Sequence, residues 1–135
     1  VNTHTHTLKD SSATMGFLWL GRSINYQNDM FRQMLDHDDE QSSPYNAAKH
    51  AYETVLKKHL SWPLQKVSQS AMKRLKPLQM PKTELFCRIG GFRKECYGCQ
   101  EEQATKRDLR QVVNSWQPLL NQWKQTFSDL DLAQI

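Results

Sequence analysis

Hydrophobic residues recur at helical spacing over residues 15–35, and the rest of the chain is best interpreted around this stretch. At 100° per residue, its apolar side chains fill slightly more than half of the helix circumference. Most of the remainder carries Asn25, Asn28, Asp29 and Arg32. So wide an apolar face predicts a helix that neighbouring elements cover on more than one side. The apolar positions are Met15, Phe17, Trp19, Leu20, Ile24, Tyr26, Met30, Phe31, Met34 and Leu35.

A second helical pattern covers residues 45–62, with apolar residues on one arc and charged residues on the other. Ser43 is the expected N-cap, and Pro44 suits the first turn of this helix. Pro63 has no backbone N–H to donate, so it predicts a kink or break at Trp62. The expected outward face carries His50, Glu53, Lys57 and Lys58.

Three later segments complete the helical pattern. Residues 64–75 continue beyond the proline, and residues 82–89 form a short helix that should end at the glycine pair 90–91. The last helix is expected over residues 101–127, with a kink at Pro118. The apolar residues of the tail, which should fold back on the helices, are Leu130, Leu132 and Ile135.

The composition favours one all-α domain over residues 1–135, because the chain is 38% hydrophobic and has only five glycines and five prolines. Residues 1–9 lack apolar periodicity and are expected to form a flexible lead-in. Residues 10–12 are all good N-cap types for the first helix. The longest unbroken apolar run, residues 17–20, is far too short to span a membrane.

The cysteine content favours a reducing compartment. Three cysteines, an odd number, do not fit a disulfide scaffold, and no secretory signal peptide is evident. We therefore expect a cytoplasmic protein. Its net charge of +4 suits an acidic partner or an anionic membrane surface, although such modest charge commonly serves solubility alone.

No pattern in the chain predicts catalysis or a bound cofactor. Cys96 and Cys99 have the spacing of half a zinc site, but Cys87 and His59 lie at no recognised interval from them. The alternating His4 and His6 have no third ligand nearby, so no metal is expected. Because no glycine-rich phosphate loop or catalytic constellation is present, we expect a protein that is not an enzyme.

Trp19, Arg22 and Tyr26 lie on one stripe at the edge of the first apolar face. One interpretation is a flat, polar-rimmed platform for a ligand. The other is that both aromatic residues belong to the core and Arg22 caps the surface. His59 has two interpretations as well, since a histidine on an apolar arc is more often a satisfied core residue than a ligand contact.

Two motifs in register resemble the glycolipid transfer protein family. Residues 17–24, FLWLGRSI, resemble the family's central helix, in which a Trp, a Leu and an Arg precede a small residue. Residues 46–62, NAAKHAYETVLKKHLSW, resemble its second signature of Ala-Tyr, Leu, His and Trp. Residues 81–86 and the aromatic last helix are also similar to its C-terminal part. The resemblance covers the chain from about Met15 to its end.

The resemblance implies a two-layer all-α sandwich without enzymatic activity. Family members carry one glycosphingolipid at a time between membranes, with the lipid chains between the helix layers. Such a slot is physically useful because each exposed methylene costs about 0.8 kcal/mol in water. The resemblance also implies a transient peripheral contact with the membrane, and we expect a monomer that binds no nucleic acid.

Carried over residue by residue, Trp19 matches the tryptophan on which the sugar stacks, with Arg22 beside it in the headgroup site. Trp62 matches the tryptophan that docks at the membrane. The family's histidine for the ceramide amide would stand at Leu60, whereas this chain has His59 one residue earlier. The amide anchor is therefore either supplied by His59 or lost.

Two further departures concern the headgroup. The family's Asp, Asn and Lys headgroup ligands lie on an earlier helix, which this chain begins too late to contain, so the resemblance is to the C-terminal part of the domain. Members that carry phosphorylated ceramide have arginines where this chain has Met15 and Trp19. Since neither residue is a cation, the resemblance implies a neutral glycosphingolipid.

Two other functions remain as alternatives. A helical protein-interaction module would keep the fold without lipid transfer, and Leu60 together with the absent ligand helix favours it. A nucleic-acid binder is less well supported, because its basic residues are scattered and lack interleaved aromatics. Those residues are Lys73, Arg74, Lys76, Arg88, Arg93 and Lys94.

Overall fold

The computed structural model describes residues 12–36, 43–75, 85–86 and 100–132, which contain helices and no strand. The all-α prediction is confirmed for these ranges. The longer helices are α1 (Ala13–Asp36), α2 (Pro44–Ala51), α3 (Trp62–Leu75) and α5 (Gln100–Asp129). Between α2 and α3 lie a π-helical turn, η1 (Tyr52–Leu56), and a 3-10 turn, η2 (Lys57–His59).

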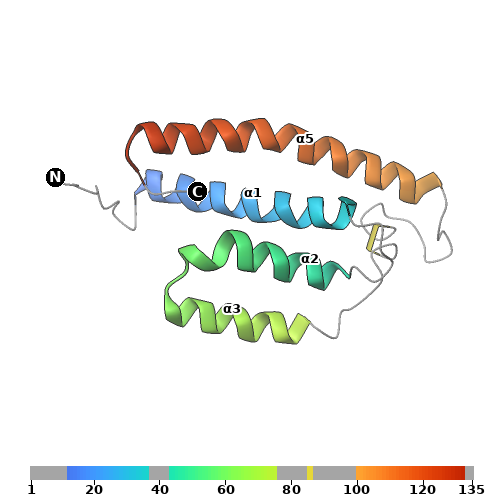
Figure 1. Ribbon diagram of the computed structural model, residues 1–135, viewed down its shortest axis with the longest axis horizontal. Coiled ribbons are helices and arrows are strands. Elements are labelled where there is room, and N and C mark those ends of the chain that lie inside the picture. Colours follow the sequence, from blue (N-terminus) through green and yellow to red (C-terminus); the bar gives the residue numbers. More distant parts are fainter. Residues whose placement is uncertain (1–11, 37–42, 76–84, 87–99, 133–135) are drawn as a thin grey trace.

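The four longer helices lie side by side in the order α5, α1, α2, α3 (Figure 1). Helix α1 packs against α5 on one side and against α2 and η1 on the other. This arrangement confirms that α1 is covered on more than one side. The described helices form a single row in this view, and the second layer of the sandwich remains a prediction.

Both predicted N-caps of this part of the chain are present. The Ser12 hydroxyl accepts a hydrogen bond from the Met15 backbone N–H at 3.1 Å, and α1 begins at Ala13. The Ser43 hydroxyl accepts one from the Asn46 N–H at 3.3 Å, with Pro44 in the first turn of α2. Each cap satisfies a backbone donor that the helix itself leaves unpaired.

The buried face of α1 differs in part from the predicted one. Leu18, which the pattern left out of the face, is only 1% exposed, whereas Phe17 and Leu20 are 57% and 49% exposed. Asn28, assigned to the polar side, is 2% exposed. These differences arise from the side on which α5 packs against α1. Leu18 packs with Phe127 of α5, and Asn28 donates a hydrogen bond to Gln117 of α5.

Two apolar clusters hold the row of helices together. The larger one joins the end of α1 to α2, α5 and the short helical segment at Leu85 and Phe86. Its buried members are Met34, Leu35, Ala47, Phe86, Leu109 and Val113. The smaller one pairs Leu18 with Phe127 at the opposite end of α1.

The prediction that the helix breaks at Trp62 was wrong, because the break lies two residues earlier, at Leu60. The chain is extended at Leu60, with φ −95° and ψ 137°, and α3 already begins at Trp62. Pro63 therefore stands in the first turn of α3, where a missing N–H costs nothing. The Gln65 side chain stabilises the turn, because its Nε2 donates to the carbonyl oxygens of Lys57 at 3.1 Å and Leu60 at 2.9 Å.

Helix α5 continues through Pro118 to Asp129, slightly beyond the predicted range. The chain then turns at Asp131, which has φ 53°, and the Leu132 N–H donates to the Phe127 carbonyl at 2.9 Å. This closure resembles the left-handed C-terminal cap common in proteins. Leu132 packs against the smaller cluster, so the tail folds back there as predicted, whereas Leu130 is 60% exposed.

Several predictions lie outside the described residues. They concern the lead-in at 1–9 with His4 and His6, and most of the short helix at 82–89 with its glycine pair. They also concern the three cysteines, Ile135 and four of the basic residues, Lys76, Arg88, Arg93 and Lys94.

The packing of α5 gives a direct stability prediction. Leu120 is fully buried, whereas its neighbour Leu119 is 47% exposed. We expect Leu120→Ala to lower the free energy of unfolding by about 2–5 kcal/mol, because it removes buried methylenes and leaves a cavity. Leu119→Ala should change it by no more than about 0.5 kcal/mol. Urea denaturation followed by circular dichroism measures both, and equal losses would contradict the assignment of the α5 face.

Candidate functional site

Trp19 and Arg22 form a stacked pair on α1. The Arg22 Cζ lies 4.8 Å from the centroid of the Trp19 ring, a cation–π geometry that their i, i+3 spacing allows. Arg22 is 7% exposed, and burial lowers its pKa, although a guanidinium stays charged in proteins. The interpretation of Arg22 as a surface cap was therefore wrong. Trp19 itself is partly exposed.

Tyr26 extends this stripe by one turn. Its side chain is half-buried, and the loss of solvent raises the pKa of its phenol. The three predicted residues of the stripe thus lie along one side of α1, with the charged member the most buried of them. This is an unusual environment for an arginine, since buried charges cost free energy unless neighbouring groups stabilise them.

His59 lies at the end of η2 and interacts electrostatically with Arg22. Burial, the positive charge of Arg22 and that of Lys58, in that order, lower its pKa to about 4. The imidazole is therefore neutral at pH 7. Its Nε2 is buried and has no hydrogen-bond partner. The interpretation of His59 as a satisfied core residue does not hold, because buried polar atoms normally have a partner.

Leu60 and Trp62 lie on the two sides of the break before α3. Leu60 is half-buried and has no polar side-chain atom. Trp62 is 70% exposed, and the Lys66 Nζ lies 5.7 Å from the centroid of its ring. Leu64 and Val67 on the same helix are also exposed, at 50% and 65%. Sequence reasoning found Trp62 but missed Leu64 and Val67 beside it.

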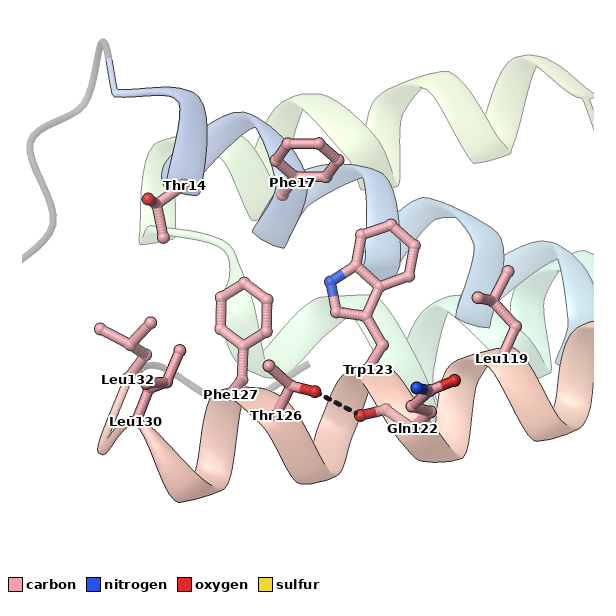
Figure 2. Close-up of a pocket in the computed structure, with 9 residues that line it drawn as sticks. All are labelled: Thr14, Phe17, Leu119, Gln122, Trp123, Thr126, Phe127, Leu130 and Leu132. Atoms are coloured by element: carbon pink, nitrogen blue, oxygen red, sulfur yellow. Dashed lines mark hydrogen bonds between the residues drawn. The ribbon is translucent and has the colours of Figure 1, made fainter.

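An apolar groove lies between the start of α1 and the end of α5 (Figure 2). It encloses about 410 Å³. Phe17 contributes from α1 and packs on Trp123 of α5, with ring centroids 6.1 Å apart. Thr126 lines it too, but its hydroxyl is engaged at 2.9 Å by the Gln122 carbonyl in its own helix. The other lining residues are Thr14, Leu119, Phe127, Leu130 and Leu132.

Sequence reasoning did not identify this groove. Its one signal in the sequence is the spacing of Leu119, Trp123 and Phe127, which by itself is typical of a buried helix face. Of the three, Phe127 is buried, Trp123 is partly buried and Leu119 is exposed. The groove is thus an accessible apolar surface on a pair of tightly packed helices.

The described ranges offer no metal centre, since no three His, Cys, Asp or Glu side chains in them converge. The half zinc site at Cys96 and Cys99 lies outside these ranges. None of the helices in the described part of the chain is long and apolar enough to cross a membrane.

The low pKa of His59 makes the stability of the fold pH-dependent. Between about pH 6.5 and pH 4 the unfolded chain protonates this histidine and the native protein does not. The contribution of the neutral imidazole to the free energy of unfolding is therefore fully present above pH 6.5, and it is lost as the pH falls towards 4. We expect His59→Gln to flatten the dependence of the free energy of unfolding on pH in this window, measured by urea denaturation. His50→Gln, at a histidine with a side chain 52% exposed, is the control. An unchanged slope in His59→Gln would contradict the assignment.

Comparison with known proteins adds one finding to this geometry. A family model described as glycolipid transfer protein matches residues 1–87, which contain Trp19, Arg22, His59, Leu60 and Trp62. No curated protein matches the chain. The matched part includes the whole stretch from α1 to α3, while α5 lies beyond it. Since the match covers well over half of the 135 residues, the chain belongs to the glycolipid transfer protein family, whose members are all-α lipid transfer proteins rather than enzymes.

Proposed function

We propose that this protein binds a sphingolipid, most specifically a neutral glycosphingolipid, and transfers it between membranes without catalysing a reaction. The observation that carries the proposal is the stacked pair of Trp19 and Arg22 beside the unpartnered Nε2 of His59. These groups provide an aromatic surface, a charged hydrogen-bond donor and a polar atom without a hydrogen-bond partner. Family membership supplies the class of ligand.

The headgroup is assigned to Trp19 and Arg22. The guanidinium covers one face of the indole at 4.8 Å and fixes the orientation of the ring. The other face is then available to the C–H groups of a sugar, which pack well on an aromatic surface. Because Arg22 has five N–H donors, it also suits the sugar hydroxyls at the edge of the ring.

The ceramide amide is assigned to the region of His59 and Leu60. Leu60 cannot form a hydrogen bond through its side chain, so the anchor falls to the buried Nε2 of His59. A neutral imidazole is well suited to this task, because it makes a hydrogen bond without bringing a charge into the apolar site. The one-residue displacement from the family pattern is compatible with this role, since η1 and η2 rotate the chain differently from a continuous α-helix.

The hydrocarbon chains need an apolar surface shielded from water. The groove of Figure 2 is apolar but accessible to water, and each methylene that a ligand buries stabilises the complex by about 0.8 kcal/mol. In the family's sandwich the chains lie between helix layers, and we assign them to the space between this row of helices and a second layer. One domain over residues 1–135 and a monomeric state are part of the proposal.

The membrane contact is assigned to the first turns of α3. Trp62, Leu64 and Val67 present exposed apolar side chains, and Lys66 adds a positive charge beside the indole. Tryptophan with lysine is favoured at the boundary between headgroups and hydrocarbon. The contact is peripheral and transient, on the cytoplasmic face of a membrane.

A helical protein-interaction module is the second candidate function. The presence of Leu60 in place of the family's histidine favours it, because a domain that does not bind ceramide has no need of that histidine. The exposed groove between α1 and α5 would then receive an apolar segment of a partner protein.

The membrane assignment is tested by Trp62→Ala. We expect binding to phosphatidylcholine vesicles that contain galactosylceramide to weaken by about tenfold, since a central interfacial tryptophan contributes on the order of 1–2 kcal/mol. The free energy of unfolding should change by no more than about 0.5 kcal/mol, because the side chain is 70% exposed. Vesicle flotation and thermal melting measure the two effects.

Leu20→Ala is the control, because Leu20 is 49% exposed but lies on α1, outside α3 and outside the apolar groove. It should leave vesicle binding unchanged. A large loss of thermal stability in Trp62→Ala with normal vesicle binding would assign Trp62 to the packing of α3 instead.

The headgroup class is tested by the transfer of galactosylceramide and ceramide-1-phosphate between vesicles, side by side. We expect the natural protein to transfer galactosylceramide faster, and Trp19→Arg to reverse the preference by about tenfold, because a phosphate needs cationic donors on one face. Trp19→Phe, which keeps an aromatic ring, should retain the preference for the neutral lipid.

Faster transfer of ceramide-1-phosphate by the natural protein would exclude the neutral-headgroup assignment. Transfer of neither lipid, with folding intact by circular dichroism, would favour the interaction module over lipid transfer.

A further inference from the structure

A polar hollow of about 380 Å³ lies where α1, the α2–η2 segment and α5 meet. Trp19, Arg22 and His59 do not line it, so it is separate from the proposed headgroup site. Its walls carry charged and amide side chains from each of these elements, and Val55 is the one aliphatic residue among them. Since a water molecule takes about 30 Å³ of the liquid, the hollow holds far more than one bridging water.

The wall of the hollow contains a buried acceptor without a partner. Asn28 is 2% exposed, and its Nδ2 donates to the Gln117 Oε1 at 3.0 Å. Arg32 Nη1 reaches the same oxygen at 3.5 Å, and because a guanidinium can only donate, that atom must be the acceptor. Asn28 must therefore present its N–H₂ group to Gln117. Its Oδ1 is left buried with no hydrogen-bond partner, an arrangement that calls for a donor.

Positive charge reaches the hollow from three separate elements. Arg32 comes from α1, Lys58 from η2 and Lys124 from α5. Arg32 and Lys124 each contact a neutral amide oxygen at 3.5 Å, on Gln117 and Asn25 respectively. No ion pair of these three cations occurs within the described part of the chain.

Asp29 is the one carboxylate among the lining residues. It already faces His50 Nδ1 at 3.5 Å and accepts from the Thr54 hydroxyl at 3.5 Å. One carboxylate against three cations leaves the hollow with net positive charge. A ligand that fits must therefore be anionic, and hydroxyl donors beside its charge suit the lone pairs of Asp29 that His50 and Thr54 leave open.

We propose that this hollow binds a phosphorylated sugar or polyol. A phosphate monoester has three terminal oxygens, which match three cations better than the two oxygens of a carboxylate do. The ring hydroxyls supply donors for the remaining lone pairs of Asp29. A neutral sugar leaves the cations without an anion, and inorganic phosphate has no ring hydroxyls to reach Asp29, so the ligand needs both parts.

The test is calorimetric titration of the natural protein with glucose 6-phosphate, glucose and inorganic phosphate. We expect glucose 6-phosphate to bind at least about tenfold more tightly than either of the others, because a charge-assisted hydrogen bond contributes about as much as a tenfold change in affinity. Lys58→Ala and Lys124→Ala should each weaken its binding by about tenfold. Both side chains are exposed, so both variants should fold, and thermal melting checks this.

Lys57→Ala is the matched control, since Lys57 is an exposed lysine beside Lys58 that does not line the hollow. It should bind glucose 6-phosphate as the natural protein does. Equal loss in Lys57→Ala and Lys58→Ala would indicate non-specific attraction and would overturn the proposal. No binding of glucose 6-phosphate by the natural protein, or unchanged binding in both hollow variants, would overturn it as well.

Two sources can present this chemistry, a soluble sugar phosphate or a lipid headgroup. Phosphatidylcholine vesicles with and without phosphatidylinositol 4-phosphate distinguish them. Glucose 6-phosphate binding that these vesicles do not displace supports a soluble ligand. If only the vesicles with phosphatidylinositol 4-phosphate displace glucose 6-phosphate, the ligand is a lipid headgroup. This displacement should then be lost in Lys58→Ala and kept in Lys57→Ala. Because Trp19 is not involved, both outcomes are independent of the galactosylceramide experiment.

Discussion

The two-sided burial of α1 is the constraint on which the rest of the structure depends. This helix touches α5 along one side and α2 with η1 along the other, so its side chains decide where both neighbours lie. Leu18 fixes it against Phe127 at one end, and Met34 and Leu35 join the larger cluster at the other. The stacked pair, the apolar groove and the polar hollow all border α1, because a helix in the centre of a row contributes to the junctions on both of its sides.

Burying α1 has a consequence for the polar residues it carries. Arg22 is held almost out of solvent against Trp19, and it influences His59 from a different element. Burial, and after it the positive charge of Arg22, lower the pKa of His59, so the imidazole is neutral at pH 7. The same helix holds Asn28 in the opposite junction, with one polar atom paired and one left over. Unpaired buried atoms of this kind are costly in a core and useful in a site, and here both occur where ligand chemistry is expected.

The turn between α2 and α3 shows how a local irregularity positions functional groups. A continuous helix from residue 45 onward would have placed His59 and Trp62 on related faces. The π-helical and 3-10 turns, followed by the extended Leu60, separate them instead. His59 then points into the protein and Trp62 into solvent. Gln65 holds this geometry by capping the freed carbonyl groups, so the first turn of α3 stabilises the turn before it.

The sequence by itself determined the all-α class, the N-cap Ser43, an N-cap of α1 within residues 10–12, the approximate extents of α1 and α5, the family and the exposure of Trp62, because periodicity, capping chemistry and motif spacing are local. Only the tertiary structure decided that Leu18 and Asn28 are buried while Phe17 and Leu20 are not, since that depends on the side from which α5 approaches α1. It also decided that the chain breaks at Leu60 rather than Trp62, because Gln65 and the proline position favour that turn. The polar hollow and the groove of Figure 2 were beyond sequence reasoning, as each joins residues far apart in the sequence: Asn28 and Gln117 are 89 positions apart, and Phe17 and Trp123 are 106 positions apart.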